Sequence, residues 1–320
     1  MEEKKLDKSS LIGMAIITVL LFWMLSGNMF SDDKKDDKTK ETAKTETAAK
    51  TPIDQLAANA QNDTVANAQL KNQLGSFAYG ASLPSVTGAK DIEVDNGVLT
   101  IVFSSKGGYI KEATVNNQKR ISSKNDDLVK IITNNNSKLD LKFATKDNRL
   151  LNTKDLSFEP TLTKEGENTV VSMKLKTSET AYLEYRYVLK PNEYMLDLSI
   201  KSVGLSSVLN TANPAELTWQ LKATRNEKSI TYENRYAEIV YEYEEGKDDY
   251  LNPAKTTSED AKDLTYVAFK QHLFTSVLLT DTPIKMAKLN QENLVTDEDE
   301  KAGFLKDFTA VMPLEYKGGE

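Results

Sequence analysis

Residues 182–202 read YLEYRYVLKPNEYMLDLSIKS, and their pattern indicates the fold class. Apolar and polar side chains alternate through Tyr182–Leu189 and again through Tyr194–Ser202, which is the period of a β-strand with one buried face. Between the two runs, Pro191-Asn192-Glu193 supplies turn residues. The stretch therefore predicts an antiparallel hairpin with one face toward the core and the other toward water.

Strand-like sequence patterns continue on both sides of this hairpin. Short alternating or β-branched runs are separated by turn sequences such as Gly107-Gly108 and Asn134-Asn135-Asn136. The further predicted strands are 98–104, 109–115, 128–132, 139–143, 170–176, 217–224, 237–243, 264–269, 272–279 and 286–289. Between them lies no long amphipathic helix of the kind that a parallel sheet needs. We predict a mainly β protein in which residues 90–320 form one large antiparallel β-sandwich, because no Pro/Gly-rich linker divides them.

An apolar segment of bilayer length stands near the N-terminus. No charged residue occurs between Lys8 and Asp32, and Leu11–Leu25 is almost entirely apolar. Since a helix of about 20 residues spans the hydrocarbon core, residues 9–30 are predicted to be a transmembrane helix that follows a short cytoplasmic tail, residues 1–8. A cleaved signal peptide is one alternative interpretation, although the segment has no clear small-x-small cleavage site. A buried core helix is the other alternative.

Residues 31–89 differ in composition from the rest of the chain. Ser31–Lys50 contains six acidic residues and six lysines, so its net charge is zero, and it has few large apolar side chains. Farther along, Ile53, Leu56, Leu70 and Leu74 are separated by polar residues and form no continuous apolar stripe. Such a segment buries too little surface to offset its ordering entropy. We therefore predict a disordered charged and polar linker that acts as a spacer.

Composition excludes several kinds of function. The 320 residues hold 41 Lys+Arg and 48 Asp+Glu, a net charge of -7, which argues against nucleic acid as a partner. There is no cysteine, which excludes disulfides, thiolate metal sites and cysteine nucleophiles. Only one histidine, His272, is present, so a His-rich metal site is impossible and a Ser-His-Asp triad would have to include this residue.

Three segments together resemble the large periplasmic domain of YidC, the family of bacterial membrane protein insertases. They occur in the family's order: 94–110 (VDNGVLTIVFSSKGGYI), 187–202 in the hairpin above, and 266–274 (YVAFKQHLF). The family often has Trp where Tyr266 stands and an aromatic residue where Leu273 stands, and residues 31–89 carry no family motif.

The resemblance implies a β-supersandwich in the periplasm, held at the bacterial inner membrane by the first transmembrane helix. It implies an insertase and chaperone that assists the insertion and folding of inner-membrane proteins, alone or with the Sec translocon. The expected partners are nascent inner-membrane proteins, the Sec translocon and the lipid bilayer, and no nucleic acid. In the family a bundle of five further helices follows, so the chain is expected to be an N-terminal portion. The apolar residues of 303–313 are compatible with a short helix or a terminal strand. The resemblance favours a short C-terminal helix that couples the sandwich to the bundle.

This function needs no covalent step, so we predict no enzyme, no cofactor, and no catalytic, cofactor-binding or metal-binding residue. His272 is interpreted as an ordinary strand histidine without an acidic partner. Ser172-Met173 lies within a strand run and lacks the Pro that follows the Ser-Met motif in signal peptidases. The acidic residues Glu242, Glu244, Glu245, Asp248 and Asp249 are interpreted as a solvated strand edge and loop.

An aromatic group leaves a second function open. Cross-strand packing is the preferred interpretation of its members, although such rings also line sugar or peptide clefts. They are Trp219, Tyr232, Tyr236, Tyr241 and Tyr243. The alternative function is a membrane-tethered protein that binds or modifies carbohydrate with the same sandwich.

Overall fold

The structure is a computed structural model that describes residues 52–121, 127–244, 246–295 and 301–316. It is mainly β, and every strand pair between neighbours is antiparallel, as predicted. The strands are β1 (Ile92–Asp95), β2 (Leu99–Phe103), β3 (Ile110–Lys119), β4 (Leu128–Ile132), β5 (Ser137–Ala144), β6 (Leu150–Asn152), β7 (Glu159–Glu165), β8 (Asn168–Lys176), β9 (Tyr182–Leu189), β10 (Leu196–Val203), β11 (Ala215–Thr224), β12 (Glu238–Tyr243), β13 (Lys247–Tyr250), β14 (Thr257–Lys270), β15 (Thr275–Asn293) and β16 (Phe304–Leu314).

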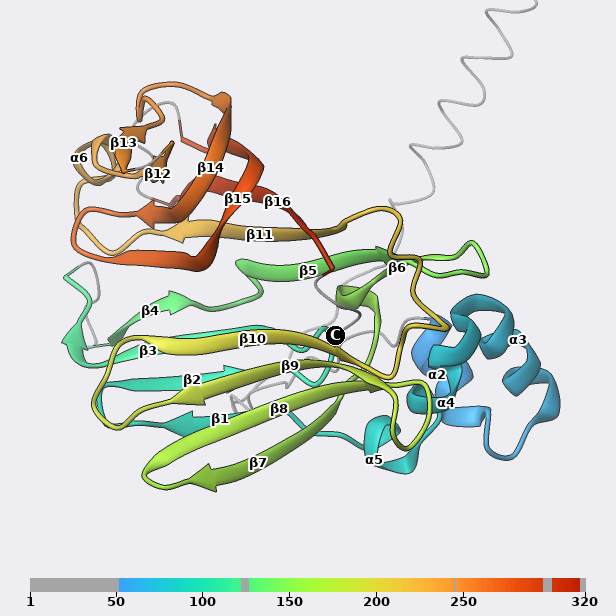
Figure 1. Ribbon diagram of the computed structural model, residues 1–320. Helices are drawn as coiled ribbons and strands as arrows, with labels where there is room; N and C mark the ends of the chain where they lie inside the picture. The colour runs from blue at the N-terminus through green and yellow to red at the C-terminus, as the bar shows by residue number, and fades with distance from the viewer. Residues whose placement is uncertain (1–51, 122–126, 245, 296–300, 317–320) are drawn as a thin grey trace, which may run out of the picture. The chain divides into compact units, whose positions relative to one another are not determined.

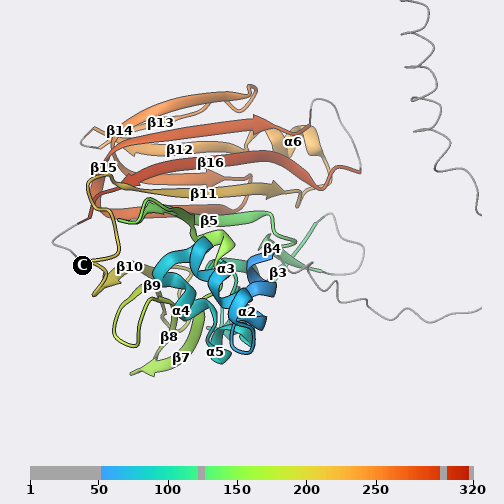
Figure 2. The ribbon, with the colours of Figure 1, turned by 90° about the vertical axis from the view of Figure 1, so that its right-hand side faces the viewer.

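Three sheets share one hydrophobic core. Two have four strands each, in the orders β1-β2-β3-β4 and β10-β9-β8-β7. The third has eight strands in the order β13-β12-β14-β15-β16-β11-β5-β6 and lies in the upper part of Figure 1. Helices α2 (Pro52–Asn59), α3 (Thr64–Leu74), α4 (Ala78–Ala81) and α5 (Pro84–Thr87) gather at one end of the smaller sheets (Figure 2), and α6 (Ile230–Arg235) lies between β11 and β12.

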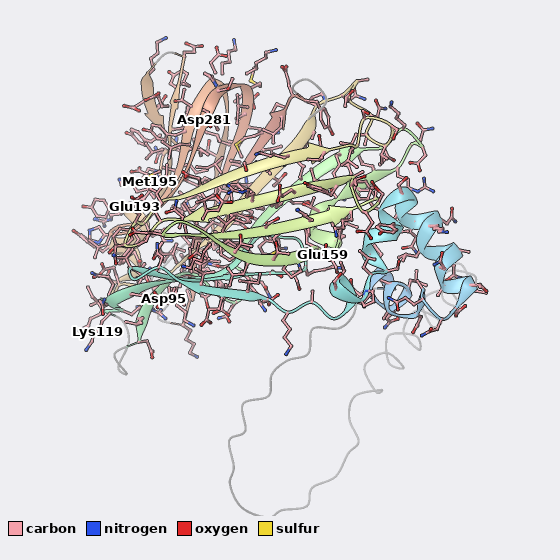
Figure 3. All side chains as sticks on the ribbon, turned by 60° about the horizontal axis from the view of Figure 1, so that its bottom comes forward. Asp95, Lys119, Glu159, Glu193, Met195 and Asp281 are labelled. Carbon is pink, nitrogen blue, oxygen red and sulfur yellow. The ribbon has the colours of Figure 1, made fainter. Side chains whose placement is uncertain are left out.

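The hairpin in residues 182–202 is present as predicted. Strand β9 pairs with β10 from Leu189↔Leu196 to Tyr182↔Val203. The backbone N–H of Asn192 at its tip donates to the Asn96 carbonyl at 2.7 Å, which joins this tip to the turn between β1 and β2. Figure 3 shows Glu193 and Met195 of this tip at the same end of the sheets as Asp95.

Two tyrosines of β9 connect the sheets through the core. The ring of Tyr187 packs against Phe103 of β2 with centroids 4.8 Å apart, and its hydroxyl donates to the Gly108 carbonyl at 2.8 Å. The hydroxyl of Tyr185 donates to Oγ1 of Thr153 at 3.1 Å, in the short 3-10 helix η2 (Thr153–Asp155) that follows β6. Both tyrosines are buried, which raises the pKa of each.

Gly107-Gly108 forms a turn, as predicted, and Gly108 has a positive φ of 69°. A Cβ at Gly108 would lie 3.0 Å from the ring of Phe158, which is buried and packs against Tyr185 with centroids 5.3 Å apart. Glycine is therefore required here both by the backbone conformation and by the space beside the tyrosines.

The predicted disordered linker is wrong for residues 52–87. Asp63 caps α3, its side chain accepting from the Val65 N–H at 2.8 Å. Three apolar side chains, Leu70, Leu74 and Phe77, are buried, and the Phe77 ring packs against Phe143 of β5 with centroids 5.4 Å apart. The helices are stable because these few residues reach the common core, although they form no long stripe in the sequence.

The predicted short helix in residues 303–313 is also wrong. This segment is strand β16, which pairs with β15 on one side and β11 on the other. Phe308, Ala310 and Met312 are buried at every second position, which is the period of a strand and not that of a helix. Residues 275–279 of the predicted strand 272–279 and all of the predicted strand 286–289 belong to one strand, β15. Its register with β14 shifts between Leu264 and Tyr266.

The predicted transmembrane helix, residues 9–30, lies outside the described residues, as do residues 31–51 of the predicted linker. Within the part of the chain that the structure describes, no helix has the length and apolar character needed to cross a membrane.

The crowding at Gly108 predicts a specific loss of stability. Gly108→Ala should lower the free energy of unfolding by about 3 kcal/mol, because backbone strain adds to the clash with Phe158. Gly166→Ala is the matched control, because Gly166 also has a positive φ, 61°, and has open space around it. Its expected cost is about 1 kcal/mol. Urea unfolding followed by circular dichroism measures both, and equal losses would contradict the proposed contact.

Buried Lys306 predicts a pH-dependent stability. Burial lowers its pKa to about 8, from 10.5, although Nζ donates to the Pro253 carbonyl at 2.6 Å. As pH falls from 10.5 through 8, the unfolded chain takes up this proton first, so stability falls with pH and the penalty is complete below 8. Relative to Lys306→Met, the unmodified chain should lose roughly 1–3 kcal/mol between pH 10 and pH 7.

Unfolding at several pH values checks this, with Lys138→Met as the control at an exposed position. Parallel stability curves for the unmodified chain and Lys306→Met would contradict the assignment.

Candidate functional site

The single histidine lies in a polar and aromatic cluster beside α6. His272 is in the turn between β14 and β15, not within a strand as predicted. Its Nδ1 lies 3.2 Å from Oε1 of Glu227, so the prediction that it has no acidic partner is wrong. The rings of Tyr232 and Tyr236 lie 5.2 and 5.0 Å from the imidazole, centroid to centroid. We call these four residues the His272 cluster.

Buried hydrogen bonds hold this cluster in place. The carboxylate of Glu233, on α6, accepts from the N–H of Asn226 at 2.9 Å and from that of Glu227 at 3.0 Å, and desolvation raises its pKa. The side chain of Asn226 donates to Gln271, next to His272, at 3.2 Å. The loop that carries Glu227 and the turn that carries His272 are therefore tied together.

The cluster offers aromatic faces and polar atoms to solvent. Tyr232 and Tyr236 are 46% and 40% exposed, and their side-chain hydrogen bond raises the pKa of Tyr232. Exposed aromatic rings beside a carboxylate and an imidazole can stack on a ligand and hydrogen bond to it without forming a covalent bond. Sequence reasoning missed this cluster because Glu227 and His272 are 45 positions apart.

The predicted aromatic group is divided among three places. Trp219 stacks on Phe269 in the core, with centroids 3.9 Å apart. Tyr241 and Tyr243 lie together on β12, with centroids 5.5 Å apart. Only the pair in the His272 cluster faces solvent through two neighbouring rings, so the five residues do not line one cleft.

The acidic residues lie on an edge and a turn, as predicted. Glu242 is on β12, and Glu244 directly follows this strand. Asp248 and Asp249 are on β13, an edge strand of the eight-stranded sheet. Asp248 accepts from the hydroxyl of Tyr266 at 2.8 Å. Glu245 lies outside the described residues. The described residues contain no group of three or more His, Asp or Glu side chains that could hold a metal ion.

Ser172-Met173 is within strand β8, as predicted. The Ser172 hydroxyl donates to Glu184 on the neighbouring strand β9, and Met173 is buried. Both side chains therefore contribute to the sheet.

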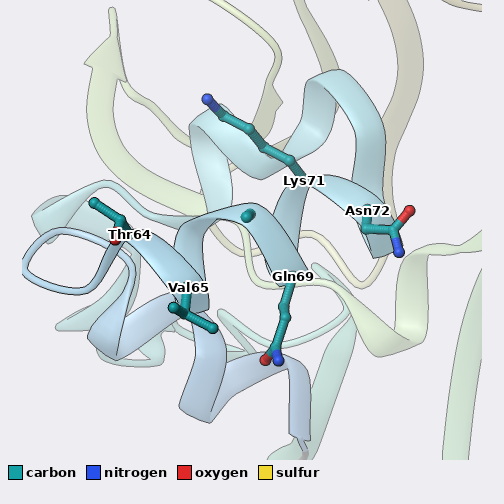
Figure 4. A pocket seen from close by; sticks show the side chains of 6 residues that line it. Thr64, Val65, Gln69, Lys71 and Asn72 are labelled. Carbon is teal, nitrogen blue, oxygen red and sulfur yellow. The ribbon is translucent and has the colours of Figure 1, made fainter.

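Helix α3 borders two open depressions. One is lined by Thr64, Val65, Ala68, Gln69, Lys71 and Asn72 and is shown in Figure 4. The other lies between α3, α4 and the turn after β5, and includes Leu70, Tyr79 and Asp147. Val65 is 62% exposed in the first, whose other side chains are small or polar.

Among solved structures, a galactose mutarotase related enzyme from Lactobacillus acidophilus is similar to this chain with a TM-score of 0.36 and 10% identity. The similarity covers 72% of this chain and 89% of that one.

The sequence comparisons are more specific. The family model for the YidC periplasmic domain matches residues 91–317. The membrane protein insertase YidC of Porphyromonas gingivalis is 30% identical over 98% of this chain and 50% of its own length. That of Phocaeicola vulgatus is 28% identical, over 96% of this chain and 47% of its own length. The chain thus spans about half the length of these relatives. It belongs to the YidC periplasmic domain family.

Proposed function

We propose that the chain is the N-terminal anchor and periplasmic domain of a membrane protein insertase and chaperone of the bacterial inner membrane. The observation that carries this proposal is the family match over residues 91–317, supported by relatives that are named membrane protein insertase YidC and are aligned over nearly the whole chain. Residues 9–30 act as the membrane anchor, and the three sheets form a β-supersandwich in the periplasm.

The proposed mechanism is non-covalent. The chain contacts nascent inner-membrane proteins, the Sec translocon and the bilayer, and it is not an enzyme and uses no cofactor. The fold suits such a role, because the hydrogen bonds of Tyr185 and Tyr187 connect the sheets into one support. No catalytic, cofactor-binding or metal-binding residue is proposed.

The anchor and the sandwich are joined by less free chain than the sequence predicted. Helices α2 to α5 occupy residues 52–87 and pack on the sheets, and Lys106 Nζ lies 2.5 Å from Oδ1 of Asp54 on α2. We propose that these helices are part of the periplasmic domain, so that the spacer consists of residues 31–51.

The proposed function predicts the mass and the contacts of the native protein. An antibody to residues 91–320 should recover, from native membranes, a species of roughly twice 35.7 kDa, because the chain spans about half of its relatives. Brief crosslinking before recovery should attach unfinished inner-membrane proteins. Mass spectrometry measures both. A native mass of 35.7 kDa with no attached membrane protein would contradict the proposal.

A second candidate function is a membrane-tethered carbohydrate-binding protein. The observation that favours it is the exposed pair Tyr232 and Tyr236 beside Glu227 and His272, since aromatic faces and carboxylates are common partners of sugars. Under this candidate, a sugar would bind at the His272 cluster.

Thermal unfolding in the presence of a panel of sugars tests this candidate. Under the carbohydrate-binding function, one sugar should raise Tm saturably, and Tyr236→Ala should remove the rise because a stacking face is lost. Tyr250→Ala is the control, because Tyr250 is 59% exposed and lies on β13, outside the cluster. No saturable rise with any sugar would count against this second candidate and leave the insertase proposal unaffected.

A further inference from the structure

The first half of β15 has a strand neighbour on one side only. Thr275–Leu279 pairs with Lys270–Tyr266 of β14. On its other side, β15 pairs with β16 only from Lys288 to Asn293. Within the described residues, no strand pairs with the second edge of Thr275–Leu279. This edge therefore presents backbone N–H and C=O groups that another strand can bind.

The side chains along this edge are apolar and exposed. Leu273, Val277 and Leu279 are 61%, 48% and 57% exposed. Val277 and Leu279 lie on one face of β15, and Leu273 lies in the turn just before this strand. We call these three residues the β15 stripe. The eight residues 273–280, LFTSVLLT, contain no charge, no proline and no glycine. Such a segment at a sheet edge pairs readily with another extended chain.

Other edge strands of the sheets carry charges that discourage pairing. Edge strand β7 contains Lys164 and Glu165, and edge strand β13 contains Lys247 and Asp248. In β15 the first such residues, Asp281 and Pro283, come only after the apolar run. The edge of residues 273–280 is thus the one of these three that is left open to strand addition.

We propose that an extended, uncharged, apolar segment of a client polypeptide adds to the sheet along residues 273–280. Backbone hydrogen bonds provide the affinity, and the β15 stripe favours apolar side chains at alternate positions. The absence of charge in residues 273–280 favours this occupant, because a charged segment would lose hydration against the uncharged edge without gaining a partner. The strand part of the site, residues 275–280, spans about 20 Å, so the site holds a short segment of an unfolded chain. This inference rests on the proposed insertase and chaperone function.

A labelled peptide tests the site on the chain held in lipid nanodiscs. The probe is an eight-residue fluorescent peptide of alternating Val and Thr, and its control is the same peptide with every backbone nitrogen methylated. Fluorescence anisotropy should show saturable binding of the first peptide only, because strand addition needs its N–H groups. Val277→Lys and Leu279→Lys should each weaken binding at least tenfold. Val65→Lys, at a position that is 62% exposed on α3, should leave it unchanged.

Hydrogen exchange supplies a second measurement. The alternate amides in residues 275–280 that face away from β14 should exchange slowly with the peptide bound and rapidly without it. Equal binding of the methylated peptide, or binding that survives Val277→Lys, would overturn the inference. So would a dimer in sedimentation velocity that Val277→Lys dissociates, since a second copy would then occupy the edge. If the peptide does not bind but clients still crosslink to the protein in native membranes, the edge site is overturned. The proposed function is then unaffected.

Discussion

The burial of two tyrosine hydroxyls constrains the whole β structure. A buried hydroxyl without a partner is costly, so Tyr185 and Tyr187 require Thr153 and Gly108 at fixed distances. The hydroxyl of Thr153 also donates to Asp140 at 3.3 Å and accepts from the Leu141 N–H at 2.8 Å. Both partners are on β5, so this hydrogen-bond network includes the eight-stranded sheet. One strand, β9, is thereby hydrogen bonded through its tyrosines to elements of both other sheets.

Sequence reasoning predicted what depends on local pattern. The hairpin of residues 182–202, strand β4 and the acidic edge follow from alternation and turn residues, and each is found at its predicted place. Residues 52–87 and 303–313 were misjudged because their structure depends on distant partners. Phe77, just after α3, packs on Phe143 of β5, and β16 is a strand because β11 and β15 lie on either side of it. The acidic partner of His272 was missed for the same reason, since a separation of 45 residues leaves no periodic signal.

The two exposed surfaces share one turn. His272 belongs to the aromatic and polar cluster beside α6, and Leu273 begins the β15 stripe. The Gln271 N–H donates to the Phe274 carbonyl at 2.8 Å and closes this turn. Gln271 is itself buried and bonded to Asn226. A ligand on either surface therefore acts on the same short piece of backbone, and the turn is the place where the two surfaces are mechanically connected.

The position of β16 affects when the fold can be completed during synthesis. It is the last described strand in the chain, yet it lies inside the eight-stranded sheet and is hydrogen bonded on both sides. Until Leu314 has been made and has reached the sheet, β11 and β15 lack the neighbour that separates them. The smaller sheets use strands that are close in sequence and can form earlier. The large sheet can therefore close only after residues 304–314 have been released. A ribosome or translocon that holds these residues back would keep that sheet open.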